Sequence, residues 1–205
     1  MLEVEVKLYL ESETAARDVC RCLDLPWHAG EFEVNRVYDF PDARLARRGA
    51  LVRIRERGGS GFLTYKEKSD QTVQDAKVRL EYETPVADPE AARKLLAGVG
   101  LEQRLAYERY RARHVHPGVH VEIDHLPGGW FCEIEGEPER IREVRGQAGL
   151  GTRLPIVWSY PEIFLALRER LGLTGTEWSF QEQERGRIHL PPSGDPFWAA
   201  AGVDS

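Results

Sequence analysis

The sequence predicts an α+β protein in which eight antiparallel strands close into a β-barrel with a charged lumen, with the helices packed on the outside. Eight segments alternate apolar and charged residues at the two-residue period of a β-strand. The charged residues of each segment are biased toward one sign. Eight strands are also enough to close a sheet into a barrel, so that one of its faces looks inward.

The strand segments begin at the N-terminus. Glu3, Glu5 and Lys7 share one face of the first segment, because successive side chains of a strand point to opposite sides. Gly58-Gly59 and Pro117-Gly118 are hairpin signals between later segments. The predicted strands are residues 2–10, 34–40, 50–57, 61–68, 76–86, 103–115, 118–125 and 129–136.

Four segments have the period of a helix, and they lie near residues 12–25, 88–98, 138–148 and 160–172. Ser159 is a candidate N-cap for the last of them, and Gly172 is its stop signal. Residues 173–205 have no clear period, although they contain the aromatic residues Trp178, Phe180, Phe197 and Trp198. We therefore expect one domain over residues 1–172, followed by a C-terminal tail that docks in part.

Bulk properties exclude several classes of protein. The formal net charge of -6 gives no general case for binding nucleic acid. No apolar run approaches the roughly 18 residues of a spanning helix, so no membrane association is expected. The three cysteines lack the spacing of a disulfide framework, which favours a reducing, cytoplasmic location.

Same-face neighbours of equal sign favour an interior rather than a solvated face for the charged residues. A like-charged pair costs a few tenths of a kcal/mol in water but roughly 2 kcal/mol at an effective dielectric near 20. In a confined lumen such pairs therefore need a compensating ligand. The acidic pairs are Glu3/Glu5, Glu81/Glu83, Glu122/Asp124 and Glu133/Glu135, and the basic pairs are Arg53/Arg55, Lys66/Lys68 and Arg109/Arg111.

The chemistry of these pairs is specific. Clustered carboxylates suit hard divalent cations such as Mg²⁺ and Mn²⁺. Clustered Arg and Lys side chains suit phosphate oxygens. A site that holds both kinds of cluster matches a metal-bound polyphosphate.

With these motifs in order, the chain resembles the CYTH superfamily, also called triphosphate tunnel metalloenzymes. That superfamily includes class IV adenylyl cyclases, thiamine triphosphatases and inorganic triphosphatases. The resemblance covers about residues 1–170, and its sixth strand carries Arg109-Tyr110-Arg111 where Lys-x-Arg is usual. The matching motifs are Glu3-x-Glu5-x-Lys7, Arg53-x-Arg55, Lys66-x-Lys68, Arg79-x-Glu81-x-Glu83, and the segments 121–127 and 129–136.

The resemblance implies a tunnel that binds a triphosphate lengthwise, and it implies roles for individual residues. Glu3, Glu5, Lys7 and Asp124 would be the catalytic residues. Phosphate contacts would come from Lys7, Arg53, Arg55, Lys66, Lys68, Arg79, Arg109 and Arg111. Metal ligands, for one or two Mg²⁺ or Mn²⁺ ions, would come from Glu3, Glu5, Glu81, Glu83, Asp124, Glu133 and Glu135.

We therefore expect a divalent-metal-dependent hydrolase whose partner is a small molecule containing a triphosphate: inorganic tripolyphosphate, thiamine triphosphate or a nucleoside triphosphate. Two alternatives stay open at this point. One is an adenylyl cyclase that converts ATP to cyclic AMP and pyrophosphate. The other is a non-catalytic sensor of polyphosphate or nucleotide. A monomer and a homodimer are both compatible with the sequence.

Overall fold

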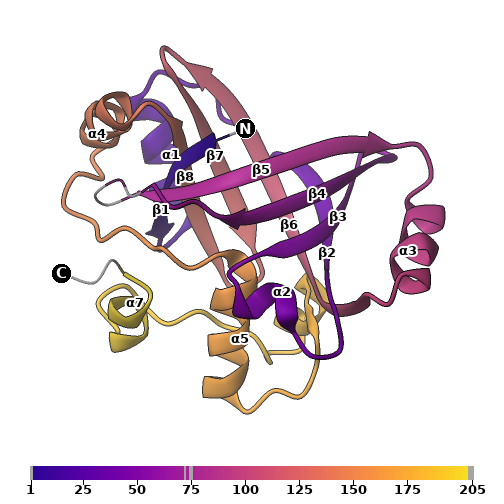
Figure 1. Cartoon of the computed structure of the whole chain (residues 1–205). Coiled ribbons are helices and arrows are strands. Elements are labelled where there is room, and N and C mark those ends of the chain that lie inside the picture. Colours follow the sequence, from indigo (N-terminus) through magenta and orange to yellow (C-terminus); the bar gives the residue numbers. More distant parts are fainter. Residues whose placement is uncertain (1, 72, 74–75, 203–205) are drawn as a thin grey trace.

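A closed antiparallel barrel forms the centre of the protein (Figure 1). The computed structural model describes residues 2–71, 73 and 76–202. The strands follow the order β2-β3-β4-β5-β1-β8-β7-β6, and pairing of β6 with β2 closes the sheet. The predicted eight-stranded barrel is therefore confirmed. The strands are β1 (Leu2–Leu10), β2 (Glu31–Asp39), β3 (Leu51–Arg57), β4 (Ser60–Lys68), β5 (Lys77–Val86), β6 (Glu102–His116), β7 (Val119–Leu126) and β8 (Gly129–Gly136).

The hairpin turns lie where the sequence places them. Gly58 and Gly59 connect β3 to β4, and both have a positive φ (54° and 78°), as a two-residue hairpin turn requires. Gly118, also at positive φ, follows Pro117 in the turn between β6 and β7. These turns set the registers that place the charged side chains of neighbouring strands opposite one another.

Helices cover two parts of the barrel's outer face. The helices α1 (Glu13–Cys22) and α4 (Pro138–Gln147) pack on the outward apolar residues of β1, β7 and β8, which include Leu8, Ile123 and Ile134. The short helix α2 (Arg44–Arg47) borders β2 and β3, and α3 (Pro89–Gly98) borders β3 and β4, around a buried cluster that includes Ile54. Helices on the outside are therefore confirmed.

The helix α5 (Tyr160–Leu171) packs differently from the expectation that helices cover the outer face. Its buried residues, Tyr160 and Phe164 among them, pack against Tyr9, Leu105 and Phe131, which have the inward parity of their strands. The helix therefore closes one end of the barrel. The inward residues at that end are apolar because they contact α5 rather than water or a ligand.

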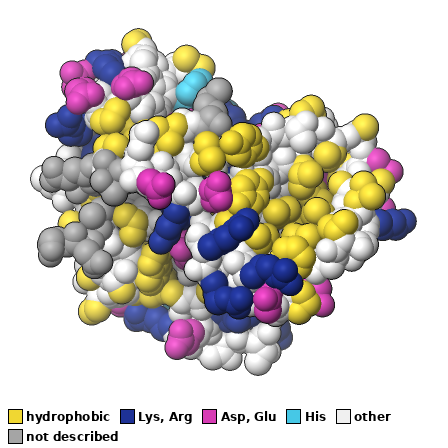
Figure 2. Space-filling model, in the orientation of Figure 1, with side chains coloured by type: hydrophobic (Ala, Val, Ile, Leu, Met, Phe, Trp, Pro, Cys, Tyr) yellow, Lys and Arg dark blue, Asp and Glu magenta, His cyan; other side chains and the backbone are white. Residues whose placement is uncertain are grey.

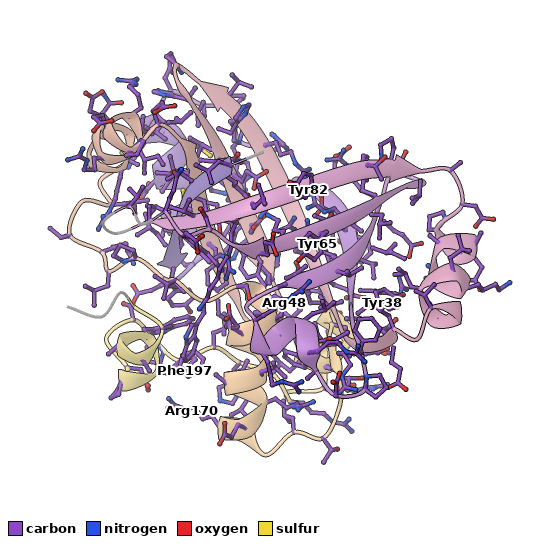
Figure 3. The ribbon with its side chains drawn as sticks, in the orientation of Figure 1. Tyr38, Arg48, Tyr65, Tyr82, Arg170 and Phe197 are labelled. Carbon is purple, nitrogen blue, oxygen red and sulfur yellow. The ribbon has the colours of Figure 1, made fainter. Side chains whose placement is uncertain are left out.

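The C-terminal segment contains short elements that the sequence pattern did not predict: β9 (Glu177–Trp178), α6 (Phe180–Glu184) and α7 (Pro196–Ala200). β9 pairs in parallel with β6, and the fully buried Trp178 stacks on Phe164. In α7, Asp195 at the N-cap accepts hydrogen bonds of 2.6 and 2.9 Å from Arg170 of α5 (Figure 3). Elements of two to five residues are too short for a periodic pattern to reveal. The domain boundary after residue 172 stays a prediction.

No helix among the described residues is long and apolar enough to span a membrane.

Candidate active site in the barrel lumen

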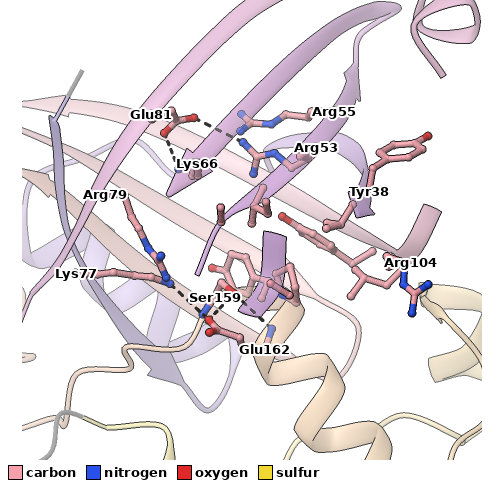
Figure 4. A pocket seen from close by; sticks show the side chains of 18 of the residues that line it. Tyr38, Arg53, Arg55, Lys66, Lys77, Arg79, Glu81, Arg104, Ser159 and Glu162 are labelled. Atoms are coloured by element: carbon pink, nitrogen blue, oxygen red, sulfur yellow. Dashed lines mark hydrogen bonds and ion pairs between the residues drawn. The ribbon is translucent and has the colours of Figure 1, made fainter. Parts of the chain in front are cut away.

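A cavity of about 1,120 Å³ occupies the barrel, and residues of all eight barrel strands line it together with residues of α2 and α5 (Figure 4). Two residues from the predicted set do not line it: Lys68 and Asp124. The predicted site residues that do line it are Glu3, Glu5, Lys7, Arg53, Arg55, Lys66, Arg79, Glu81, Glu83, Arg109, Arg111, Glu133 and Glu135.

One side of the cavity, which we call the acidic wall, consists of Glu3, Glu5, Glu122, Glu133 and Glu135 on β1, β7 and β8. Strand register places Glu5 directly opposite Glu135 and Glu122 directly opposite Glu133. Like charges in such positions repel. Burial, followed by the charges of Glu3, Glu122 and Glu5, raises the pKa of Glu135 to about 7. The acidic wall therefore carries unbalanced negative charge.

Part of the acidic wall is held by cations. Lys66 donates to both carboxylate oxygens of Glu3, at 2.8 and 3.0 Å, and lies 2.6 Å from Glu81. Lys7 lies 2.9 Å from Glu133. Burial alone would raise the pKa of Glu133, but Lys7 and then Arg111 hold it well below its usual value.

Glu5 and Glu135 have fewer or longer contacts with cationic side chains than Glu3 and Glu133 have. Glu5 reaches Lys7 only at 3.8 Å, and no ion pair joins Glu135 to another residue that the structure describes. No three Asp, Glu, His or Cys side chains in the described ranges already form a metal-binding group. Nevertheless, two opposed carboxylates with repelling charges present the hard oxygen donors that Mg²⁺ and Mn²⁺ prefer, so this donor set fits such an ion.

Asp124 lies behind the cavity surface and is fully buried. Its carboxylate accepts hydrogen bonds from Arg111 Nε at 2.6 Å, from Arg109 Nη1 at 3.3 Å and from Tyr160 Oη at 2.6 Å. In this arrangement Asp124 holds two arginines and the first residue of α5 in place. A buried carboxylate with this many donors is a strong orienting group.

The opposite side of the cavity, which we call the basic wall, consists of Arg53 and Arg55 on β3 and Arg109 on β6. Burial, and then the guanidinium groups of Arg53 and Arg109, lower the pKa of Arg55 to about 9. Glu83 lies 3.4 Å from Arg55 and 3.6 Å from Arg53, which offsets only part of the repulsion. Arg109 is paired with Glu33 and Asp124, so within the basic wall the uncompensated positive charge lies at Arg55.

Two residues of β2 contribute to the basic side although the sequence analysis did not select them. Glu33 is fully buried and accepts a hydrogen bond of 2.8 Å from Arg109 Nε, and Arg113 donates to it as well. Asn35 is also fully buried, opposite Arg55 and Tyr107, and neither atom of its amide has a hydrogen-bond partner in the described chain. The second strand was expected to begin at residue 34, so Asn35 lay inside it and Glu33 lay just outside. Had the predicted strand begun at Glu33, the two-residue alternation would have placed Glu33 and Asn35 on the same face.

The remaining predicted cations lie on β4 and β5. Arg79 donates a hydrogen bond of 2.8 Å to the carbonyl oxygen of Gly49, which ties the lumen to the segment after α2. Lys77, another lining residue, lies 3.9 Å from Glu162 of α5, and burial together with Lys7 lowers its pKa to about 7. Lys68 is exposed, and the aliphatic part of its side chain lies beside Gly49.

Comparison with known proteins was made by family and by structure. The CYTH domain family model matches residues 1–148. No curated protein sequence matches the chain. A Pyrococcus horikoshii protein of known structure is 28% identical, with a TM-score of 0.66 over 80% of this chain and 98% of its own.

Two further structures share the fold. A candidate adenylate cyclase from Vibrio parahaemolyticus is 20% identical, with a TM-score of 0.65 over 80% of this chain and 98% of its own. A Hippeastrum protein, described as a candidate adenylyl cyclase that reveals a dominant triphosphatase activity, is 22% identical, with a TM-score of 0.56 over 82% of this chain and 96% of its own. Since the family model matches more than half of the residues and the barrel is closed in the expected order, this chain belongs to the CYTH domain family.

Proposed function

We propose that the protein is a divalent-metal-dependent hydrolase of triphosphate substrates, in which water attacks a phosphoryl group in the lumen and releases orthophosphate and a diphosphate. The observation that carries the proposal is the pair of opposed walls in one cavity. Glu5 faces Glu135 on one side, and Arg53, Arg55 and Arg109 crowd together on the other. Glu135 on one wall and Arg55 on the other carry charge that like-charged neighbours oppose, so a ligand of opposite sign would stabilise each of them.

Individual roles follow from these contacts. Arg53, Arg55 and Arg109 offer guanidinium groups to phosphate oxygens, with Lys7, Lys66, Arg79 and Arg111 around them. Glu3, Glu5 and Glu135 would hold Mg²⁺ or Mn²⁺, which when bound neutralises phosphate charge and lowers the pKa of water. Glu133 and Asp124 orient Lys7 and the arginines of β6, and Glu81 and Glu83 do the same for Lys66 and the arginines of β3.

A substrate panel tests the proposal. The purified protein receives Mg²⁺ or Mn²⁺ with tripolyphosphate, thiamine triphosphate or ATP, and orthophosphate, pyrophosphate and cyclic AMP are quantified. We expect orthophosphate release that stops when a chelator removes the metal. Formation of cyclic AMP and pyrophosphate from ATP would instead identify a cyclase. Tight tripolyphosphate binding without turnover would identify a sensor.

The variant Glu5→Gln tests the metal assignment within the same assay. It removes one charge from the acidic wall with little change in shape, so we expect turnover to fall by at least about a hundredfold. Glu139→Gln on α4 is the matched control, because that side chain is 74% exposed and lies outside the cavity. Full activity of Glu5→Gln would rule out the role assigned to Glu5.

A further inference from the structure

The segment that connects α4 to α5, which we call the linker (residues 148–159), contains no helix or strand, yet it lies directly against β1. The N–H group of Ile156 donates a hydrogen bond of 2.8 Å to the carbonyl oxygen of Lys7. The guanidinium group of Arg153 donates one of 3.1 Å to the carbonyl oxygen of Tyr9. The linker therefore runs along β1 at the lysine whose side chain holds part of the acidic wall.

The side chain of Lys7 is held from the same direction. Its ammonium group donates to the carbonyl oxygen of Trp158 at 3.4 Å and lies 4.3 Å from the ring centroid of Tyr160, where α5 begins. A lysine ammonium has three N–H groups, and Glu133 accepts a second one at 2.9 Å. The third is left for Glu5, at 3.8 Å, or for a ligand in the lumen. The linker thus helps to set the direction in which this third N–H group points.

The helix α7 lies on the other side of the linker. The N–H group of Val157 donates a hydrogen bond of 2.8 Å to the carbonyl oxygen of Ala201, directly after α7. Ile156 forms an antiparallel bridge with Gly202. Because an irregular segment has no ladder of its own, its backbone groups depend on partners from the flanking elements. The linker is therefore held between β1 on one side and the end of α7 on the other.

Two aromatic residues attach α7 to the linker and to β1. The ring of Phe197 meets the ring of Trp158 edge-on at 5.6 Å, and the ring of Trp198 stacks on that of Tyr9 at 4.5 Å. The rest of α7 is at the surface, where Figure 2 shows hydrophobic side chains over this helix. Within the described part of the chain, no residue of α7 lines the cavity. Any influence of α7 on the site must therefore pass through the linker and β1.

We propose that α7 is a positioning element of the site: it holds the linker against β1 and thereby fixes the ammonium group of Lys7 toward the lumen. The role of Lys7 in binding phosphate rests on the proposed function. A lysine ammonium sits on a flexible four-carbon stem, so without fixed partners it would sample many positions. Phe197 and Trp158 are positioning residues in this scheme, because they act through Lys7 and not on the ligand.

Amide hydrogen exchange, followed by NMR, tests the contact without any substrate. In Phe197→Ala we expect the N–H groups of Ile156 and Val157 to exchange at least about tenfold faster relative to those of β8. Leu101→Ala is the matched control, because it leaves a void in the separate buried cluster around Ile54. Its relative exchange at Ile156 should equal that of the wild type. Unchanged relative protection of Ile156 in Phe197→Ala would overturn the proposal.

A double-mutant cycle tests the link to activity. We would measure kcat/KM for tripolyphosphate with Mg²⁺ in Phe197→Ala, in Lys7→Met, which keeps an unbranched stem without the charge, and in the double variant. Since α7 acts through Lys7, Phe197→Ala should lower kcat/KM about tenfold when Lys7 is present and less than about twofold in the Lys7→Met background. Phe197→Leu, which restores an apolar side chain, should recover most of the loss. An equal factor in both backgrounds would contradict the proposal.

These measurements separate the proposal from the proposed function. If the wild type hydrolyses none of the triphosphates, the proposed function fails, and the same cycle is then measured as calorimetric Kd values for tripolyphosphate. If tripolyphosphate does not bind either, the exchange of the Ile156 N–H group decides by itself whether α7 holds the linker against β1, because that measurement needs no ligand.

Discussion

Glu135 carries a clear charge imbalance among the residues that line the cavity. Its neighbour across the β1–β8 ladder is another carboxylate, and no described cation pairs with it. Its pKa lies near 7, above its ordinary value of 4.5, so ionisation of Glu135 is more favourable in the unfolded chain than in the folded one. Without metal, its negative charge therefore opposes folding.

The sign of this effect predicts a pH dependence. Below pH 4.5 the carboxyl group is protonated in both the folded and the unfolded protein, so it does not lower the unfolding free energy. Between pH 4.5 and about 7 the group ionises in the unfolded chain before it does so in the folded protein, and the unfolding free energy falls. Glu135→Gln should therefore raise the unfolding free energy of the metal-free protein by about 1 kcal/mol near pH 8, after discounting for solvent screening, and by almost nothing near pH 4. Urea denaturation at the two pH values measures this, and an equal effect at both would contradict the assignment.

Asn35 gives a second prediction at the residue scale. Its buried amide lacks partners in the described chain, which costs about 1–3 kcal/mol, whereas an apolar side chain of similar size would not carry that cost. Asn35→Leu should therefore raise the unfolding free energy by about 1 kcal/mol. Urea denaturation measures the gain. A variant no more stable than the wild type would contradict the assignment of an unsatisfied amide to Asn35.

At the scale of elements, α5 and the C-terminal segment form the closed end of the barrel. Trp178 of β9 is fully buried, stacks on Phe164 at 5.7 Å and donates a hydrogen bond of 2.8 Å to the carbonyl oxygen of Pro127. Tyr160, the first residue of α5, connects the same cluster to Asp124 in the site. The C-terminal segment thus supports the position of the arginines of β6, and its residue Thr176 lines the cavity.

We predict that Trp178→Ala lowers the unfolding free energy by about 3–5 kcal/mol, because it leaves a large void in a fully buried cluster. Chemical denaturation measures the loss. Leu154→Ala, at a side chain that is 71% exposed, is the control and should change stability by less than about 0.5 kcal/mol. If Trp178→Ala lowered the unfolding free energy by no more than the small loss expected of the control, the C-terminal segment would contribute little to the closed end.

At the scale of the whole molecule, the proposed function predicts that the two walls couple metal binding to substrate binding. A bound cation would relieve the repulsion that Glu3 and Glu5 exert on Glu135, and a polyphosphate would relieve the repulsion that Arg53 and Arg109 exert on Arg55. In one cavity the two ligands also attract each other, so each should tighten the binding of the other by the same factor.

Thermal melts with Mg²⁺, with tripolyphosphate, and with both therefore provide a test. The shift with both ligands should exceed the sum of the single shifts, and a ligand at a hundred times its Kd contributes about 2.7 kcal/mol. Glu135→Gln should lose most of the Mg²⁺ increment and keep the tripolyphosphate increment, whereas Arg55→Gln should do the reverse. Strictly additive shifts in the wild type would argue for two independent sites.

Much of the barrel could be predicted from the sequence because its information is local. The alternation of Glu3, Glu5 and Lys7 shows which side chains share a face, and the same period identifies Arg53 with Arg55. Turn chemistry at Gly58-Gly59 needs no distant contact either. Short elements such as β9 could not be predicted, because a strand of two residues is too short to show a periodic pattern. The helix α5 was expected on the outer face, because a helical pattern does not show which surface the helix covers.

The sequence by itself therefore determined the strands, the sign of the charge on each and the family to which they belong. Only the tertiary structure decided which charges meet. The pairing of β1 with β8 opposes Glu5 to Glu135, and the closure of β2 on β6 brings the buried Glu33 to Arg109, 76 residues further along the chain. Such pairings depend on register between distant strands, which the whole barrel sets through its core and its turns. For that reason the charge imbalance of the lumen belongs to the fold rather than to any local motif.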